Sequence, residues 1–299
     1  MQITVVPASP KTGQASIRAL LESAGEHTIT GVYRNLDKVP SEFKGHPRFR
    51  AVKGDVANVG TLNFSGADAV VTITPPLYSE SKPIQRAREM AANVKYAVGR
   101  ANDSVKRLVY VSSVGAQYEH GTGELKTNYE AEQALVAAAP EVVFIRCAYF
   151  MENWASAVET VKTDSPFFYS VIAPEDYKIP MVSVEDIGRT CAAQVLAAGS
   201  PLSYNPYIFD LHGPEAYSTR DLQKVFEDKL GKPVQAKLVT DDQLEGFFAQ
   251  AFQPPVDGMF VEMTRSFLPG GIAVDMMEGS RVQRGRVTLS EAIGKMVTG

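Results

Sequence analysis

Residues 107–113 read Arg-Leu-Val-Tyr-Val-Ser-Ser, an apolar and β-branched run of strand length. A second such run, Glu-Val-Val-Phe-Ile-Arg, occupies residues 141–146, and a helix-like segment at 129–138 separates the two. Strands that alternate with helices at this spacing are typical of right-handed β–α–β crossovers, which place the strands parallel in one sheet. This unit therefore predicts a parallel sheet with helices on its faces.

The same alternation extends toward the N-terminus. We expect strands at residues 3–6, 28–33, 49–53 and 69–74 and helices at residues 15–24 and 81–101. Pro75 and Pro76 end the fourth strand, because proline cannot continue a hydrogen-bonded ladder. The predicted fold class is α/β, with a doubly wound parallel sheet that helices cover on both faces.

The strand–helix rhythm loosens after about residue 150. We expect helices at 185–198, 218–230, 241–252 and 289–297 and a strand at 234–239. The chain is therefore predicted to divide into a first domain at 1–150 and a smaller C-terminal α/β lobe at 151–299. Two segments of the second half, about 179–182 and 207–211, are expected to return to the main sheet.

The composition is that of an ordinary folded protein and argues against several function classes. The 299 residues carry 30 Lys and Arg against 34 Asp and Glu, whereas nucleic-acid-binding proteins usually carry a clearly basic face. No apolar run approaches the roughly 18 residues of a membrane span, and no signal peptide is visible, so we expect a cytoplasmic protein without a membrane partner. Cys147 and Cys191 lack metal-ligand spacing, so no metal site is expected.

The turn after the first predicted strand, residues 7–13, reads Pro-Ala-Ser-Pro-Lys-Thr-Gly. In a doubly wound sheet this turn carries the phosphates of a nucleotide, and the usual Gly-x-x-Gly-x-x-Gly spacing would place glycines at 7, 10 and 13. Only Gly13 is present. Ser9, Lys11 and Thr12 offer side-chain donors in place of the N–H groups that the prolines lack, and the helix N-terminus still favours an anion. The alternative is a turn that binds no nucleotide.

Arg34 follows the second predicted strand, where a dinucleotide-binding fold recognises the adenosine ribose. An acidic residue there binds the 2′-hydroxyl of NAD(H), whereas arginine accommodates the 2′-phosphate of NADP(H). Arg34, with Asn35 beside it, therefore predicts NADP(H) as the cofactor, against the alternative of a solvated surface arginine. The path across the strand ends continues through further candidate cofactor contacts at Asp55, Val56, Thr74, Pro75 and Pro76.

Several motifs together resemble the NmrA-like branch of the atypical short-chain dehydrogenases, over nearly the whole chain. The resemblance is carried by residues 54–56, 67–70 with 74–76, 107–116, 149–153, 179–181 with 185–188, and 211–215. The Pro-Ala-Ser start of the first turn is similar to a subgroup met among fungal proteins. The resemblance implies a Rossmann domain with NADP(H) across the strand ends, a substrate cleft under the C-terminal lobe, and further cofactor contacts at Ser112, Lys126 and Asn128.

The catalytic pair of the short-chain dehydrogenases is missing. These enzymes reduce carbonyls with a Tyr-x-x-x-Lys pair, in which the tyrosine gives a proton to the developing alkoxide. Here Thr122 stands four places after Tyr118, and Gln133 four places after Tyr129. Related NmrA-like reductases keep a lysine at the position of Asn128. Ketone reduction is therefore disfavoured, whereas hydride transfer to an imine or enone needs less acid help and stays open.

Four residues are candidates for acid–base chemistry. Tyr118 follows the fifth predicted strand, and Tyr149 and Glu152 follow the sixth, at the edge of the sheet where the nicotinamide is expected. A carboxyl group buried beside an apolar substrate has a raised pKa, which makes Glu152 a candidate, against a structural role at a helix start. Asp275 is a further candidate, against an ordinary surface acid.

The second half of the chain also supplies aromatic residues for a substrate pocket. Phe247, Phe248 and Phe252 cannot all face one way on a helix, so at least one is expected to line a cleft rather than the core. Walls of this kind suit a flat, apolar or aromatic molecule.

Three functions follow from these features, and the sequence leaves the oligomeric state open. The leading hypothesis is an NADP(H)-binding enzyme of specialised metabolism, such as alkaloid biosynthesis. It would form or cyclise an imine or iminium by acid–base chemistry, as in a Pictet–Spengler closure, with a mainly structural cofactor. The alternative is an NADPH-dependent reductase of an imine or activated alkene. The third is a regulatory protein that senses NADP(H) and docks on a partner.

Overall fold

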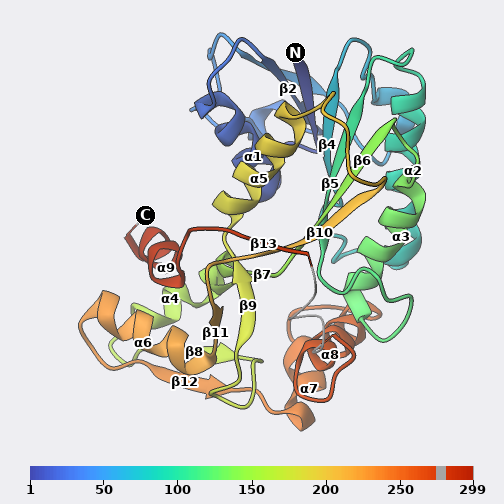
Figure 1. Ribbon diagram of the computed structural model, residues 1–299. Coiled ribbons are helices and arrows are strands. Elements are labelled where there is room, and N and C mark those ends of the chain that lie inside the picture. Colours follow the sequence, from blue (N-terminus) through green and yellow to red (C-terminus); the bar gives the residue numbers. More distant parts are fainter. Residues whose placement is uncertain (274–280, 299) are drawn as a thin grey trace.

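The centre of the molecule is a parallel sheet, as the sequence predicted (Figure 1). The computed structural model describes residues 1–273 and 281–298, and among these residues eight parallel strands join in the order β13-β10-β6-β5-β4-β1-β2-β3. In chain order they are β1 (Gln2–Val6), β2 (Thr28–Tyr33), β3 (Phe49–Lys53), β4 (Ala69–Ile73), β5 (Arg107–Ser113), β6 (Glu141–Cys147), β10 (Tyr207–His212) and β13 (Val282–Arg284). The order 3-2-1-4-5-6 at its core is that of a Rossmann fold.

Helices cover both faces of this sheet. On one face lie α1 (Lys11–Glu22) and α5 (Val184–Leu196), and on the other lie α2 (Pro83–Gly99) and α3 (Lys126–Leu135) (Figure 1). Side chains of each strand alternate between the two layers, so that Ile3 packs with Ile17 of α1 while Val70 packs with Val94 of α2. The double burial explains why the strands are continuous apolar runs.

The second half of the chain completes the main sheet. Residues 207–211 lie in β10, which pairs with β6, as expected, and β13 forms the edge beside β10. Helix α5 packs against α1 so closely that a Cβ on Gly188 would lie 2.4 Å from the carbonyl carbon of Ala15. The backbones of the two helices therefore touch, and only glycine fits at residue 188.

A smaller lobe lies below the carboxyl edge of the sheet in Figure 1 and has its own apolar core. Its strands are β7 (Tyr149–Phe150), β8 (Phe167–Ser170), β9 (Ile179–Val182), β11 (Ala216–Tyr217) and β12 (Gln235–Leu238). Its helices include α4 (Val158–Val161), α6 (Thr219–Leu230) and α9 (Leu289–Thr298). The expected return of 179–182 to the main sheet was wrong, because β9 pairs with β7 and β11 instead.

Two further helices lie below α3 in Figure 1, against the turn that precedes α3, and they correct the single helix expected at 241–252. The regular helix there is only α7 (Leu244–Phe248), preceded by a short 3-10 turn at Asp241–Gln243. The sequence did not predict α8 (Val256–Phe267), which starts directly after Pro254 and Pro255. Proline is favourable in the first turn of a helix, so the pair that ends one helical segment also precedes the next.

None of the helices in residues 1–273 and 281–298 is long and apolar enough to cross a membrane. Within the same residues, no group of three or more His, Cys, Asp and Glu side chains is arranged to hold a metal ion.

Candidate functional site

The parallel strands bring most of the predicted cofactor residues to one edge of the sheet. Residues 9–13 follow β1, Arg34 and Asn35 follow β2, Asp55 and Val56 follow β3, and 74–76 follow β4. Because all these strands run the same way, their carboxyl ends meet at a common edge, where doubly wound sheets bind their ligands. Whether each residue contacts a cofactor stays a prediction.

The turn after β1 leads directly into the N-terminus of α1. No side chain caps this helix. Among the described residues, none accepts a hydrogen bond from the backbone N–H of Lys11, Thr12 or Gly13. A Cβ on Gly13 would lie 2.8 Å from the carbonyl oxygen of Pro7, so the turn closes against the helix only with glycine. Open N–H groups at a helix N-terminus attract an anion, and this turn therefore fits the pyrophosphate of a dinucleotide.

Glu152 lies at the same edge but is engaged in the fold. Its Oε2 accepts a hydrogen bond of 2.9 Å from the backbone N–H of Val184, the first residue of α5. Burial raises the pKa of this carboxyl, while hydrogen bonds from backbone N–H groups and the charge of Lys11 partly offset the effect. These contacts match the structural alternative for Glu152, and its catalytic role stays a prediction.

Arg34 is exposed and forms no ion pair with any described residue, so its guanidinium is open to a ligand. Asn35 shapes the turn beside it, because its Oδ1 accepts a hydrogen bond of 2.9 Å from the N–H of Asp37. Asp55 holds its own loop in the same way, accepting from Ala57 N–H at 2.9 Å. These hydrogen bonds help to fix the turns that follow β2 and β3.

Thr74 and Asn128 come together on a tyrosine that sequence reasoning treated only as part of a strand. The hydroxyl of Tyr110, in β5, lies 2.8 Å from Thr74 Oγ1 and 3.0 Å from Asn128 Nδ2. Tyr110 is only 1% exposed, and its burial raises its pKa, so the hydroxyl keeps its proton. Three separate elements therefore join through one buried hydroxyl at the carboxyl ends of β4 and β5.

Ser112, two residues along the same strand, is turned to the interior instead. Its hydroxyl donates to Glu132 Oε1 at 2.6 Å, and the same carboxylate accepts from Arg146 Nε at 2.9 Å. The Ser112 hydroxyl proton is therefore engaged by Glu132 in this structure, and a contact of Ser112 with a cofactor stays a prediction. Lys126 begins α3 and forms no ion pair within the described residues.

Glu124, in the 3-10 turn Gly123–Leu125 before α3, is a candidate acid that sequence reasoning missed. Burial raises the pKa of its carboxyl to about 6, while a hydrogen bond from Thr127 partly offsets the effect. The carboxylate is near enough to Tyr78 and Tyr110 to raise the pKa of both. A carboxyl group with a pKa near neutrality beside a ligand edge can hold and release a proton under physiological conditions.

No hydrogen bond among the described residues joins Tyr118 or Tyr149, two of the predicted catalytic residues, to Glu124, and their catalytic roles stay predictions. Tyr118 lies in the turn after β5, where its N–H donates to Gly115 O at 3.1 Å. Tyr149 packs between the rings of Trp154 and Phe267, and burial raises its pKa to about 12. Asp275 lies outside the described residues.

The predicted aromatic residues form a packed cluster rather than an open wall. Phe252 stacks on Phe260 of α8 with ring centroids 4.3 Å apart, and Phe248 lies 5.5 Å from Phe260. Tyr78, from the loop after β4, packs edge-on against both stacked rings at 5.3 and 5.4 Å. This cluster fastens α7 and α8 to the loop that follows Thr74.

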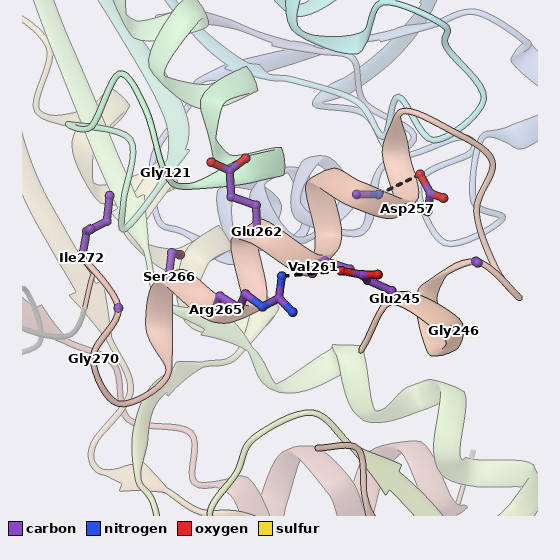
Figure 2. A pocket seen from close by; sticks show the side chains of 13 residues that line it. Gly121, Glu245, Gly246, Asp257, Val261, Glu262, Arg265, Ser266, Gly270 and Ile272 are labelled. Carbon is purple, nitrogen blue, oxygen red and sulfur yellow. Dashed lines mark hydrogen bonds and ion pairs between the residues drawn. The ribbon is translucent and has the colours of Figure 1, made fainter. Parts of the chain in front are cut away.

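A groove of about 810 Å³ runs along the side of α8 (Figure 2). Its charged lining residues are Glu245, Asp257, Glu262 and Arg265, and Arg265 also binds Asp241 with Nε–Oδ1 at 2.7 Å. The volume suits a small ligand. None of the predicted cofactor or catalytic residues lines it.

A sequence model of NAD(P)H-binding proteins matches residues 8–197, more than half of the chain. The chain belongs to this NAD(P)H-binding family. The match runs from the turn after β1 to the end of α5 and includes Gly13, Arg34, and the Thr74–Tyr110–Asn128 group. No curated protein sequence matches the chain.

Solved structures share the fold of this NAD(P)H-binding protein over its whole length. The triphenylmethane reductase of Citrobacter sp. complexed with NADP(H) is 17% identical, with a TM-score of 0.74, covering 99% of this chain and 100% of that one. An NADPH-dependent quinone oxidoreductase from Escherichia coli complexed with NADPH is 16% identical, with a TM-score of 0.71 and 99% of each chain covered. NmrA, a negative transcriptional regulator, is 18% identical, with a TM-score of 0.63, covering 80% of this chain and 74% of that one. These neighbours support the NmrA-like resemblance at the level of the fold, and the fungal subgroup stays a prediction.

Proposed function

We propose that this protein is an NADPH-dependent reductase of a small, apolar imine or activated alkene, acting in specialised metabolism. The observation that carries the proposal is the position of Glu124, a proton-holding carboxyl beside the Thr74–Tyr110–Asn128 group at the ends of β4 and β5. Structural neighbours that are NADPH-dependent reductases support the same reading.

Arg34 and the N-terminus of α1 would hold the cofactor. The open guanidinium of Arg34 suits a 2′-phosphate, which favours NADPH over NADH, and the open N–H groups of residues 11–13 suit the pyrophosphate. When bound, the cofactor supplies a hydride. The family-typical Tyr-x-x-x-Lys pair is absent, so any proton donor must come from elsewhere in this chain.

Glu124 is the group that would supply this proton. A protonated Glu124 gives its proton to an imine nitrogen, which leaves an iminium carbon that accepts a hydride more readily. The product is an amine that carries the added proton and hydride. Glu124, left as a carboxylate, regains a proton from solvent, and its raised pKa makes this easier than for an ordinary glutamate.

A second candidate is the non-redox closure of an imine or iminium, of the Pictet–Spengler type, with a structural cofactor. It is favoured by one observation: Asn128 is hydrogen-bonded to Tyr110 and stands where related reductases keep a lysine. Glu124 would protonate the imine in this reaction as well.

Incubation of the protein and NADPH with a panel of cyclic imines, enones and arylethylamine–aldehyde pairs separates the two candidates. A reductase consumes NADPH in step with a product two hydrogens heavier, and Glu124→Gln lowers that rate at least about a hundredfold, the lower end of the range for one acid–base group. Glu119→Gln, an exposed carboxylate of the preceding loop, is the matched control. A cyclised product with no loss of NADPH would favour the second candidate, and no product from any class would overturn both.

A further inference from the structure

The buried hydroxyl of Tyr110 sits at the centre of a chain of three polar groups. Asn128 Nδ2 lies 3.0 Å from it on one side and Thr74 Oγ1 lies 2.8 Å from it on the other. The phenol ring is fixed by an edge-on contact with Phe144 at 6.0 Å. Thr74, by contrast, is only partly buried, so the chain runs from the protein interior to the sheet edge.

The direction of these hydrogen bonds follows from the donors available. An amide nitrogen only donates, so the Tyr110 oxygen accepts the bond from Asn128. A buried hydroxyl proton without an acceptor is unfavourable, and Thr74 Oγ1 is the only other hydrogen-bond partner of Tyr110 Oη among the described residues. Tyr110 therefore donates to Thr74. The hydroxyl proton of Thr74 then points away from Tyr110, and no described residue accepts a hydrogen bond from it.

The position of Asn128 is held by a second set of contacts one helical turn away. Glu132 lies four residues further along α3, on the same face of the helix, and binds Ser112 and Arg146. The ion pair between Glu132 and Arg146 joins α3 to β6. Buried hydrogen bonds through Tyr110 and Asn128 thus determine the orientation of the Thr74 hydroxyl.

The sheet order shows which half of a dinucleotide meets Thr74. In this type of fold the adenosine ribose is recognised at the end of β2 and the pyrophosphate at the end of β1, which is the neighbouring strand in the sheet. The remaining half extends in the opposite direction, toward β4 and β5. We propose that Asn128, Tyr110 and Thr74 form a hydrogen-bond relay that fixes the Thr74 hydroxyl as a donor to the nicotinamide-ribose half of the bound cofactor. The inference rests on the proposed binding of NADPH.

Calorimetric titration with two ligands tests the relay without any substrate. NADPH carries both halves of the cofactor, whereas adenosine 2′,5′-bisphosphate carries only the adenosine half. We expect Thr74→Val and Tyr110→Phe each to weaken NADPH binding about threefold to tenfold, the range of one neutral hydrogen bond, and to leave adenosine 2′,5′-bisphosphate within about twofold. Thr74→Ser keeps the hydroxyl and should restore the affinity for NADPH.

The relay also predicts non-additivity. If Tyr110 acts through Thr74, the double variant Thr74→Val/Tyr110→Phe binds NADPH no more weakly than Thr74→Val alone. The matched control is Tyr33→Phe, because the Tyr33 hydroxyl is buried without a hydrogen-bond partner in the described structure and lies in the opposite core layer. This variant should leave both affinities unchanged.

Three results would overturn the relay alone: unchanged NADPH affinity in Tyr110→Phe, equal loss of affinity for both ligands, or additive effects in the double variant. Failure of the wild-type protein to bind either ligand would instead overturn the proposed function and the relay with it.

Discussion

Glu132 and Arg146 form a bidentate ion pair inside the protein, with Nε–Oε1 at 2.9 Å and Nη2–Oε2 at 2.6 Å. Their side chains are 3% and 15% exposed, so breaking the pair leaves a nearly buried charge. We expect Glu132→Gln to lower the free energy of unfolding by about 3–5 kcal/mol, as measured by urea denaturation.

The control for this substitution is Glu42→Gln, which breaks an ion pair with Arg18 on the surface, where both side chains are about half exposed. That change should cost no more than about 1 kcal/mol. Similar losses for the two variants would contradict a structural role for the buried pair.

Asp210 lies close to the same pair, and its stability contribution depends on pH. Burial raises the pKa of Asp210 to about 6, while Arg146 lowers it and Glu132 raises it. The folded state therefore binds this proton more tightly than the unfolded state, and its stabilising effect is lost as the pH rises through about 6. Asp210→Asn should raise Tm at about pH 8 but not at about pH 4. An equal shift at both values would show that the carboxyl is not titrating.

Removal of the Arg34 guanidinium should change cofactor selectivity. Arg34→Ala is expected to weaken NADPH binding roughly tenfold to hundredfold, the range of a charge-assisted hydrogen bond, and to leave NADH binding unchanged. Arg50→Ala, an exposed arginine of β3, controls for the loss of one positive charge. Equal weakening by both variants would indicate a general electrostatic effect rather than recognition of the 2′-phosphate.

The raised pKa of Glu124 predicts a pH profile. If its protonated carboxyl supplies the proton to an imine, kcat/KM falls as the pH rises through about 6, because the acid form is lost. Glu124→Gln should flatten that limb of the profile as well as lower the rate. A limb that persists in this variant would assign the proton to another group.

Gly123 touches the backbone of α8. A Cβ there would lie 2.0 Å from Met259 O, and the backbone φ of Gly123 is +54°. We expect Gly123→Ala to cost about 1–3 kcal/mol in urea denaturation, as overpacking does. Gly258→Ala, on α8 with nothing within 4 Å of the added Cβ, should instead stabilise by about 0.5–1 kcal/mol. The reverse order would mean that α8 does not pack on the turn at Gly123.

Local patterns were sufficient to predict the sheet but not every helix start. The strands at 28–33, 49–53 and 107–113 coincide with β2, β3 and β5. The buried strand β5 is recognisable as a nearly continuous apolar run without knowledge of its partners. The first helix begins at Lys11 rather than at 15, since it has no capping side chain to mark its start. The pairing of β9 with β7 and β11 could not be predicted, because these two strands have only two residues each and show no recognisable sequence pattern.

The candidate site was predictable where position along the strands determines it, as for Thr74 and Arg34. Tyr110 fits an apolar strand pattern, so nothing in the sequence distinguishes its hydroxyl from that of a core tyrosine. The raised pKa of Glu124 depends on its burial, and α8 packs against the turn that holds Glu124. Helix α8 lies more than 130 residues later in the chain. Such a long-range contact leaves no local signal at residue 124.

The close contact of Gly188 with Ala15 limits how this chain can be recombined with its relatives. Helix α1, which follows the turn at residues 7–13, packs on α5, a helix much later in the chain. The sheet gains β10 and β13 from still later segments. A chimera that exchanges everything after residue 150 would replace α5, the helix on which α1 and the turn at residues 7–13 pack. Grafts of a new C-terminal lobe therefore need to keep α5, β10 and β13 from the parent that supplies residues 1–150.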